Sequence, residues 1–417
     1  MTRPLISFII PAFNSQEHLN ECVTSITNQV FYQTNYEIII INDASKDNTL
    51  NICNKLKKKN IKVINNKRNL GVSLSRNKGI KLSKGEYLFF LDSDDRLCNS
   101  AISRIIKTVR FKDADLFFYL PNTNLIKKFG RKKMKGTNDH VFNLLNNYDN
   151  FTAHPWNFII RKKFLEKKKI FFNNIKTFED QVFTSKILIK AEKINFFSKK
   201  ICNHSERLNS LSRKTNSLTI FSILDVIYEV SSLIFKDKLS QKKKTFLIKR
   251  ITFLIKLLKG YFVISQKRDE VRIKTYLKKI NDKLIFSPNK IKFNELSQTS
   301  KKAKYAIEKL RKFKNKNIYI FGSGMYGRLT SKLLLKYSIN FNSFLDNNKK
   351  FDGKFCLNKP ISSFKKFFPL SHDQLDHIMV VLPLDNKEDI LKNFKKFQGY
   401  GLNKKNIKVI NWRKIIK

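Results

Sequence analysis

Short apolar runs alternate with amphipathic stretches along the first half of the chain. Each run is brief and bounded by turn-forming residues, which favours a buried strand over a buried helix. The predicted strands cover residues 5–10 (ended by Pro11), 37–41, 61–65, 87–91 and 115–120, and helical spacing occurs between the first three at 17–29 and 49–59. Strands that alternate with helices over short connections predict βαβ units and a doubly wound parallel sheet.

The pattern changes twice further along the chain. Residues 177–191 have the spacing of an amphipathic helix with an acidic start, and 193–205 are predicted as one further strand. From 217 to 285 the spacing is helical throughout, and 287–317 is a Lys- and Asn-rich connector with one short helix. The alternation then restarts, which predicts a second, smaller α/β domain. We expect domains at 1–216 and 313–417, with a helical segment and connector at 217–312.

One predicted helix, at residues 245–264, combines a wide apolar surface with a narrow basic stripe. Lys249, Thr252, Lys256 and Lys259 recur every three to four positions. Packing of the apolar residues against the preceding domain explains this pattern. A basic helix that lies on an anionic membrane surface explains it as well, and both interpretations stay open.

The chain is strongly basic. Its 417 residues include 84 Lys and Arg against 33 Asp and Glu, a formal net charge of +51. Such a charge favours anionic partners, either nucleic acid or a membrane surface. However, the cations are mostly Lys and are spread over the whole length, which indicates a compositional bias and no specific nucleic-acid site.

Cysteine usage and the apolar runs bear on the compartment. Five cysteines are scattered without a Cys-x-x-Cys pair, which argues against a zinc site or a disulfide framework. The amino terminus begins with a strand pattern and not with a signal peptide. No uninterrupted apolar run approaches the roughly 18 residues that a spanning helix needs. We expect a cytoplasmic protein, peripheral on the inner face of the cell membrane if the basic helix binds lipid.

An acidic cluster directly follows the predicted strand at 87–91. Asp92, Asp94 and Asp95 stand close together in a chain that has few carboxylates. Neighbouring carboxylates repel one another unless a cation or strong donors lie between them. In open α/β sheets the carboxyl end of a strand is also where ligands bind. The cluster is therefore a candidate cation site, and a solvated turn that caps the next helix is the alternative.

Four motifs in chain order carry a family resemblance. They are SFIIPAFNSQEHLNECVTSITNQ, EIIIINDASKDNT, SRNKGIKLSKGEYLFFLDSDD and FEDQVF. This series resembles the inverting family 2 glycosyltransferases of the GT-A fold. The resemblance implies a metal-dependent enzyme that moves a sugar from a nucleotide-diphosphate donor to a glycan or lipid-linked acceptor in cell-surface polysaccharide biosynthesis.

The resemblance implies a nucleotide pocket at the carboxyl ends of the first strands. Pro11 and Asn14 would edge the nucleoside, and Asp43 would accept a hydrogen bond from the base. The family usually has two acids and a Gly in the Asp43 turn, whereas this chain has Asn42 and Ala44 there. The retained Asp43 is the residue expected to matter.

The same resemblance assigns the diphosphate and its metal. Arg76 would reach the base or the phosphates, unless it is an exposed helix cation. Asp94 would bind Mg²⁺ or Mn²⁺, and Asp92 would be shared between the ribose and this metal, because such cations often combine one or two carboxylates with substrate phosphate. The metal would act as a Lewis acid on the departing diphosphate. Asp95 is expected to cap the next helix.

The Glu179-Asp180 pair corresponds to the motif in which the family carries its general base. Asp180 would take the proton from an acceptor hydroxyl as that oxygen attacks the anomeric carbon. Two acids that stabilise a helix N-terminus are the alternative interpretation.

Four residues are weaker candidates for contact with the acceptor or the diphosphate: Trp156, Glu179, His204 and Arg207. Trp156 lies in a Trp-Asn segment that resembles the family's acceptor side, where it would stack on a sugar or else belong to the core. His204 and Arg207 lie where the family places cations near the diphosphate, although the usual tyrosines before them are missing. The remaining histidines show no catalytic arrangement: His18, His140, His154, His372 and His377.

The last domain carries its own motif. Gly322, Gly324 and Gly327 form Gly-x-Gly-x-x-Gly directly after a predicted strand, and Asp346 ends the following strand. This context predicts a Rossmann-like nucleotide or nucleotide-sugar site, and the segment resembles the small domain attached to many polysaccharide-pathway enzymes. A purely structural or assembly domain is the alternative.

Two other functions compete with the transferase. In the first, the last domain also acts on a nucleotide sugar, so that the enzyme is bifunctional. In the second, the transferase domain has decayed to a non-catalytic, anion-binding module. The joint retention of Asp43, Asp92, Asp94 and Asp180 argues against decay.

Overall fold

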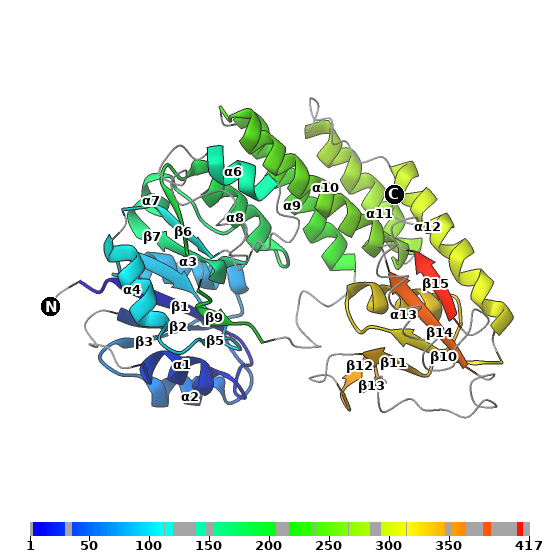
Figure 1. Cartoon of the computed structure of the whole chain (residues 1–417), viewed down its shortest axis with the longest axis horizontal. Helices are drawn as coiled ribbons and strands as arrows, with labels where there is room; N and C mark the ends of the chain where they lie inside the picture. Colours follow the sequence, from blue (N-terminus) through cyan, green and yellow to red (C-terminus); the bar gives the residue numbers. More distant parts are fainter. Residues whose placement is uncertain are drawn as a thin grey trace. The chain divides into compact units, whose positions relative to one another are not determined.

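The computed structural model divides into two compact units (Figure 1). One contains Met1–Glu206 with Asp225–Ile251, and the other contains Arg207–Leu224 with Thr252–Lys417. The helices expected at 217–312 are thus shared between the units, and the exact domain boundaries stay a prediction. The structure describes residues 3–29, 36–111, 113–119, 139–146, 154–197, 199–205, 217–236, 238–265, 267–283, 293–313, 315–346, 352–363, 378–384 and 407–411.

A seven-stranded sheet forms the centre of the first unit, in the order β3-β2-β1-β4-β7-β6-β8. β1 to β4 are mutually parallel, as predicted, while β7 runs antiparallel to both β4 and β6. The strands are β1 Ile6–Ala12, β2 Tyr36–Asn42, β3 Ile61–Asn65, β4 Tyr87–Phe90, β6 Leu116–Tyr119, β7 Phe158–Arg161 and β8 Ile194–Phe197.

Helices cover both faces of this sheet, which is why its strands are apolar at nearly every position. On one face, Phe8 and Phe89 belong to a core shared with α1 and α4. On the other, Ile9 touches Gly79 of α3, and Phe90 packs on Phe183 of α8. The helices of this unit up to residue 190 are α1 Leu19–Thr27, α2 Thr49–Leu56, α3 Val72–Leu82, α4 Ala101–Phe111, α6 Asp139–Asn146, α7 Lys162–Lys167 and α8 Glu179–Lys190.

β1 does not end at Pro11, which corrects the sequence prediction. Pro11 pairs with Ile41, and the strand continues to Ala12. The carbonyl of Ile9 accepts from Leu91 N on the β4 side, and Pro11 faces the same side, beyond the end of β4. The missing N–H of proline therefore costs no ladder hydrogen bond.

The strand predicted at 193–205 is two strands in two different sheets. β8 is the edge strand of the main sheet, and β9 (Cys202–Asn203) pairs antiparallel with β5 (Arg96–Leu97). β5 comes directly after the acidic cluster, so this small ribbon brings the segment after β9 next to the cluster.

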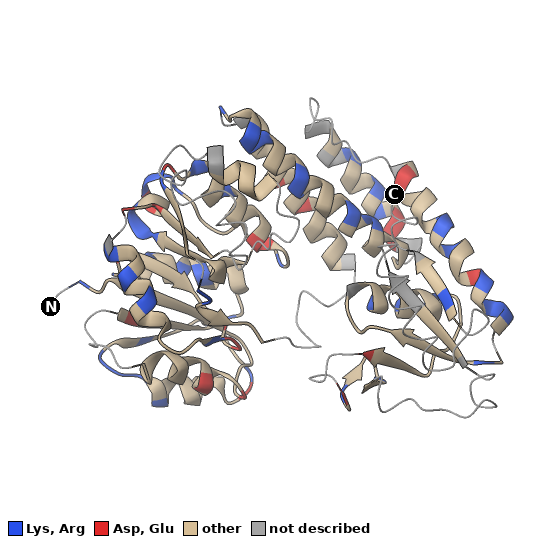
Figure 2. Ribbon diagram, in the orientation of Figure 1, with Lys and Arg blue, Asp and Glu red and all other residues tan. Residues whose placement is uncertain are grey.

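The basic helix predicted at 245–264 is part of α10 (Gln241–Val263), and most of its apolar residues are buried, although Phe253 is 47% exposed. Lys249, Thr252 and Lys256 are exposed, and Lys259 pairs with Glu295. In the first unit α10 is anchored by Lys243, whose Nζ donates to Ile189 O at 2.6 Å. Packing against the protein therefore accounts for most of the apolar surface of this helix, and binding of the helix to a membrane surface stays a prediction. Lys and Arg also appear on helices and loops of both units and are not gathered on this helix (Figure 2).

α9 (Ser217–Lys236) contains one window, Leu218–Phe235, that is long and apolar enough to cross a membrane by length and composition. Its mean hydropathy is 1.8, and 56% of it is buried within the protein. Asp225 and Glu229 interrupt the run, and the core helix of a soluble protein has the same properties. The window is therefore weak support for a membrane span.

A six-stranded sheet in the order β12-β13-β11-β10-β14-β15 forms the second unit. β10 lies between β11 and β14, parallel to both, as the predicted Rossmann-like pattern requires. The expected short connector helix is in fact the 16-residue α12. The elements of this region are α11 Lys267–Lys283, α12 Phe293–Glu308, β10 Asn317–Phe321, α13 Met325–Lys336, β11 Ser343–Asp346, β12 Phe355–Cys356, β13 Lys359–Ser363, β14 Ile378–Leu384 and β15 Ile407–Asn411.

Gly324, at the N-cap of α13, and Gly327, in the first turn of that helix, differ in how much space surrounds them. A Cβ on Gly327 would overlap the carbonyl oxygen of Gly322, a backbone atom that cannot rotate away. Gly324 has no heavy atom within 4 Å of the corresponding position and has an ordinary φ of −66°. The two positions thus form a matched pair.

We expect Gly327→Ala to destabilise the second unit by about 3 kcal/mol, as overpacking against a fixed group does. Gly324→Ala should cost no more than about 1 kcal/mol, the difference between residues at a helix N-cap. Urea unfolding of the full chain, followed by circular dichroism, measures both. Equal losses would contradict the close approach of the loop and α13.

Candidate active site

The carboxyl ends of β1, β2 and β4 lie at one edge of the main sheet, and the predicted donor residues follow them. Asp43 comes after β2, and the acidic turn comes after β4. The hydroxyl oxygens of Ser15 and Ser93 lie 2.7 Å apart and join the loop after β1 to this turn. The structure therefore assembles the predicted site from segments far apart in the sequence.

Asp43 is buried, and its carboxylate is held by three donors. Oδ1 accepts from Asn66 Nδ2 and Leu70 N at 2.8 and 2.9 Å, and Oδ2 accepts from Gly71 N at 2.8 Å. These bonds fix the turn that begins α3, because helix-start N–H groups need outside acceptors. Asp43 is thus a fixed acceptor at the strand end, and its contact with a nucleotide base stays a prediction.

The loops after β1 and β2 hold each other through Asn14. Its N–H donates to Ser45 Oγ at 3.0 Å, and its Oδ1 accepts from Lys46 N at 2.9 Å. Ala44, which stands where the family has Gly, adopts a left-handed φ of +54°. That conformation costs a non-glycine residue roughly 1–2 kcal/mol. The substitution keeps the turn but strains it.

Arg76 lies between two carboxylates, and its side chain is only 4% exposed. Its Nη2 donates to Asp92 Oδ1 at 2.8 Å and its Nη1 to Glu179 Oε1 at 2.7 Å. Burial opposes its charge, but the attraction of Asp92 and Glu179 outweighs burial and raises the pKa of Arg76 above its ordinary value. The predicted alternative of an exposed cation is wrong, and contact with phosphates stays a prediction.

α3 also holds the segment that leads into α8. Asn77 exchanges two hydrogen bonds of 2.8 Å with the backbone of Phe172, and Ser73 Oγ donates to Ile175 O at 3.3 Å. The Phe172 ring lies under the guanidinium of Arg76, 5.1 Å from its centre. The start of α8, with Glu179 and Asp180, is therefore placed by α3.

Glu179 is buried at the first turn of α8, after Phe178 in a left-handed conformation with φ +65°. Burial raises its pKa from 4.5 to about 7, with Asp180 adding to the effect and Arg76 opposing it. Glu179 therefore gives up its proton less readily than an exposed glutamate does, because burial disfavours its charged form.

The structure pairs Asp180 with His154, a residue that the sequence analysis passed over. Their Oδ2 and Nδ1 atoms lie 3.4 Å apart. His154 stacks on Trp156 with centroids 4.3 Å apart, and His204 stacks on the same ring at 4.8 Å. Histidine two residues before the Trp-Asn segment was the available signal, but only the fold brings it to Asp180.

Asp95 does not cap the next helix, which corrects that expectation. Its buried Oδ1 accepts from Ser205 N at 2.9 Å and lies 3.0 Å from His204 Nδ1. The hydrogen bond with Asp95 raises the pKa of His204, and burial raises the pKa of Asp95. His204 thus contacts the acidic turn through Asp95, and its role near the diphosphate stays a prediction. Arg207 lies outside the described residues.

The described residues contain no group of three or more His, Cys, Asp or Glu side chains that could hold a metal ion. Asp92 keeps one oxygen beyond its bond to Arg76, and Asp94 is half-buried in the same turn. Two carboxylates supply part of a coordination shell, and this donor set fits a divalent cation that substrate phosphates complete.

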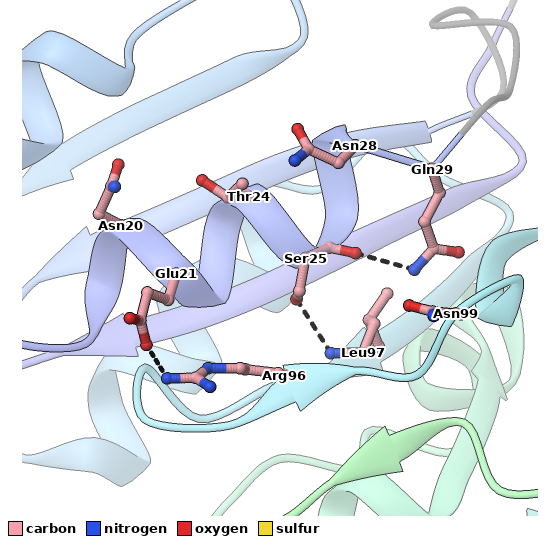
Figure 3. A pocket seen from close by; sticks show the side chains of 9 residues that line it. All are labelled: Asn20, Glu21, Thr24, Ser25, Asn28, Gln29, Arg96, Leu97 and Asn99. Atoms are coloured by element: carbon pink, nitrogen blue, oxygen red, sulfur yellow. Dashed lines mark hydrogen bonds and ion pairs between the residues drawn. The ribbon is translucent and has the colours of Figure 1, made fainter.

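A polar hollow of about 360 Å³ lies over α1 and β5 (Figure 3). Ser25 Oγ accepts from Leu97 N, and Gln29 Nε2 donates to the carbonyls of Ser25 and Cys98. These groups hold β5 on α1, so the hollow has a structural explanation. It is lined by Asn20, Glu21, Thr24, Ser25, Asn28, Gln29, Arg96, Leu97 and Asn99.

In the second unit the glycine loop is held by Asp346. Its Oδ2 accepts from both Ser323 N and Ser323 Oγ, at 2.7 and 2.6 Å. Gly322 has a φ of +88°, which requires glycine. The loop follows β10, the strand that lies between β11 and β14, so the order of the strands changes direction at this point. In open α/β sheets a nucleotide usually binds at such a point. Nucleotide binding here stays a prediction, since Asp346 already has a partner within the loop.

A pH-dependent stability follows from the buried Glu179. Its folded pKa of about 7 lies above the 4.5 of the free side chain, so ionisation costs stability as pH rises through this window. Glu179→Gln removes that titration. We expect the variant to gain unfolding free energy relative to the parent between pH 5 and 7.5, and the gap to level off above. Urea unfolding across this range measures it, and a gap independent of pH would contradict the assignment.

Comparison with known proteins agrees with this geometry. Residues 7–169 match Glycosyl transferase family 2. Poly(ribitol-phosphate) beta-glucosyltransferase of Bacillus spizizenii is 35% identical over 179 residues, 42% of this chain and 28% of that protein. Poly(ribitol-phosphate) beta-N-acetylglucosaminyltransferase TarP of Staphylococcus aureus is 42% identical over 114 residues, 27% of this chain and 35% of that protein. The chain thus spans about a third of the length of these relatives.

Among solved structures, TarS 1-349 of S. aureus in complex with UDP-GlcNAc superimposes with a TM-score of 0.54 at 20% identity. The match covers 74% of this chain and 87% of that one, and at this identity it shows the fold alone. The family match, the strand order and this likeness together identify the amino-terminal part of the chain as a family 2 glycosyltransferase domain of the GT-A fold.

Proposed function

We propose that the chain is a metal-dependent inverting glycosyltransferase that uses a nucleotide-diphosphate sugar. The observation that carries the proposal is the Asp92–Arg76–Glu179 network, with Asp180 beside it. It supports the proposal because Asp92, which we assign to the metal, and Asp180, the candidate base, are both linked to Arg76 at the strand ends, where α/β sheets bind ligands. A buried charge destabilises the fold when one of its ion-pair partners is lost. A decayed domain would have no functional reason to keep all three charged residues of this network.

The donor half of the site is assigned to the loops around Asp43 and the acidic turn. Asp43, Pro11 and Asn14 would form the nucleoside pocket. UDP-GlcNAc is bound by the TarS relative of similar fold, so a uridine-diphosphate sugar is the proposed donor class. Asp94, with Asp92, would hold Mg²⁺ or Mn²⁺ against the diphosphate. Such an ion supplies positive charge that stabilises the leaving group.

The chemical step is assigned to Asp180. The acceptor oxygen attacks the anomeric carbon, the bond to the diphosphate breaks, and Asp180 takes the hydroxyl proton. Arg76 and Glu179 act through position: they tie the base-bearing start of α8 to the turn that carries Asp92. A single displacement of this kind inverts the configuration at the anomeric carbon.

The proposed acceptor is a phosphate-bearing glycan or polyol chain of the cell surface. Two relatives are named for transfer to poly(ribitol-phosphate), and the +51 net charge of this chain favours an anionic acceptor. The same charge would hold the protein at an anionic lipid surface on the cytoplasmic side, in a salt-dependent way.

Two substitutions separate donor binding from chemistry. Asp94→Ala should lose Mn²⁺-dependent binding of UDP and all turnover, because a metal ligand is gone. Asp180→Asn should bind UDP within twofold of the parent and lose about 100-fold or more in kcat, the usual contribution of a general base. Calorimetry with UDP and Mn²⁺ and hydrolysis of UDP-GlcNAc and UDP-glucose measure the two effects.

Asp113→Asn is the matched control. It makes the same change at an exposed carboxylate that pairs with Arg161 and Lys193, away from the site. Parent-like turnover in Asp94→Ala and Asp180→Asn would reject the proposed function.

A further inference from the structure

His154 and Asp180 face each other in a way that leaves both with unused hydrogen-bonding capacity. Asp180 Oδ1 and His154 Nδ1 are buried, and neither has a hydrogen-bond partner in the described part of the chain. The Asp180 side chain is 16% exposed and that of His154 is 39% exposed. Since the Nδ1 atom is covered, the exposed area of His154 lies on the rest of its side chain, and Nε2 is not among the buried polar atoms without a partner. The imidazole therefore connects a nearly buried carboxylate with solvent.

Trp156 fixes the position of this imidazole. The centroids of His154 and His204 lie 6.1 Å apart. Two rings on opposite faces of an indole would lie about 7 Å apart or more, twice a carbon contact distance. Both imidazoles therefore lie side by side on one face of Trp156. His154 cannot rotate freely away from Asp180, and this face of Trp156 is covered by imidazole.

The charged groups around the pair have other partners. Arg76 donates to Asp92 and Glu179, and Arg250 of α10 donates to Gln181. Both guanidinium groups act on Asp180 electrostatically. On the side of the stack, His204 is bonded to Asp95. Among the described residues, His154 is thus the titratable group in ion-pair contact with Asp180.

We propose that His154 is a positioning residue that acts through Asp180. It accepts the proton that Asp180 has taken from the acceptor and passes a proton on to water. The inference rests on the proposed function. With the imidazole proton on Nε2, the Nδ1 lone pair faces Asp180 Oδ2. After the acceptor hydroxyl has given its proton to Asp180, that proton passes to Nδ1, and Nε2 releases its own proton to water. Asp180 returns to the carboxylate, and His154 returns to its first tautomer after proton exchange with water.

Three variants of the full chain test this role. His154→Phe keeps a flat ring on Trp156 without nitrogen, and His154→Ala opens a space that free imidazole can enter. Asp180→Asn is the control in which no proton is taken up. The measurements are hydrolysis of UDP-GlcNAc with Mn²⁺, with and without added imidazole, and calorimetric binding of UDP with Mn²⁺.

We expect His154→Phe and His154→Ala to lose about 100-fold in kcat, the lower range for a positioned proton acceptor, with UDP affinity within twofold of the parent. Imidazole should restore at least part of kcat in His154→Ala and nothing in His154→Phe or Asp180→Asn. Parent-like kcat in both His154 variants would overturn the inference. So would a loss without rescue by imidazole, or a loss accompanied by weaker UDP binding, since these indicate a structural role.

Failure of this inference is distinct from failure of the proposed function. If Asp180→Asn is inactive while both His154 variants are as active as the parent, only the role of His154 is rejected. If the parent hydrolyses neither UDP-sugar, or if Asp180→Asn equals the parent, the proposed function is rejected and this inference with it.

Discussion

The candidate active site depends on one buried positive charge, that of Arg76. Arg76 joins α3 to the turn after β4 through Asp92 and to the start of α8 through Glu179. Removing water from a guanidinium is costly, and the cost is offset only because two carboxylates lie within hydrogen-bond distance. The carboxylates depend on Arg76 in turn. Without its positive charge, Asp92, Glu179 and Asp180 would repel one another at a site with little access to water. The ion-pair network therefore holds three segments together and allows acids to gather where a diphosphate would bind.

A second layer of contacts surrounds this network and decides the environment of each acid. The β5–β9 ribbon brings His204 to Asp95, and Trp156 places His154 beside His204 and next to Asp180. Two carboxylate–imidazole pairs thus share one indole face. Carboxylates close in sequence consequently differ in chemistry: Asp92 is bonded to arginine, Asp95 to histidine, and Asp94 is half-buried in the turn between them.

The second unit repeats the same construction principle with different chemistry. Its glycine loop also follows a central parallel strand, but the acid at the next strand end binds Ser323 of the loop itself. The close approach of Gly327 to the Gly322 carbonyl and the left-handed φ of Gly322 explain two of the three glycines, whereas no contact in the structure requires glycine at Gly324. The stability of the loop thus accounts for part of a motif that is typical of nucleotide sites, and nucleotide binding there stays a prediction.

The sequence by itself determined the strand–helix alternation, the parallel direction of the first four strands and the identity of the acids at the strand ends, because short apolar runs and turn residues are local signals. It did not determine the order of the strands in the sheet. It did not determine that β1 passes through Pro11 or that 193–205 divides between two sheets, because both depend on where a neighbouring strand ends. The burial of Arg76, the pairing of Asp95 with His204 and the contact of His154 with Asp180 were decided by the tertiary structure alone. Each joins residues from separate elements, and side chains far apart in sequence carry no local pattern that says which of them will meet.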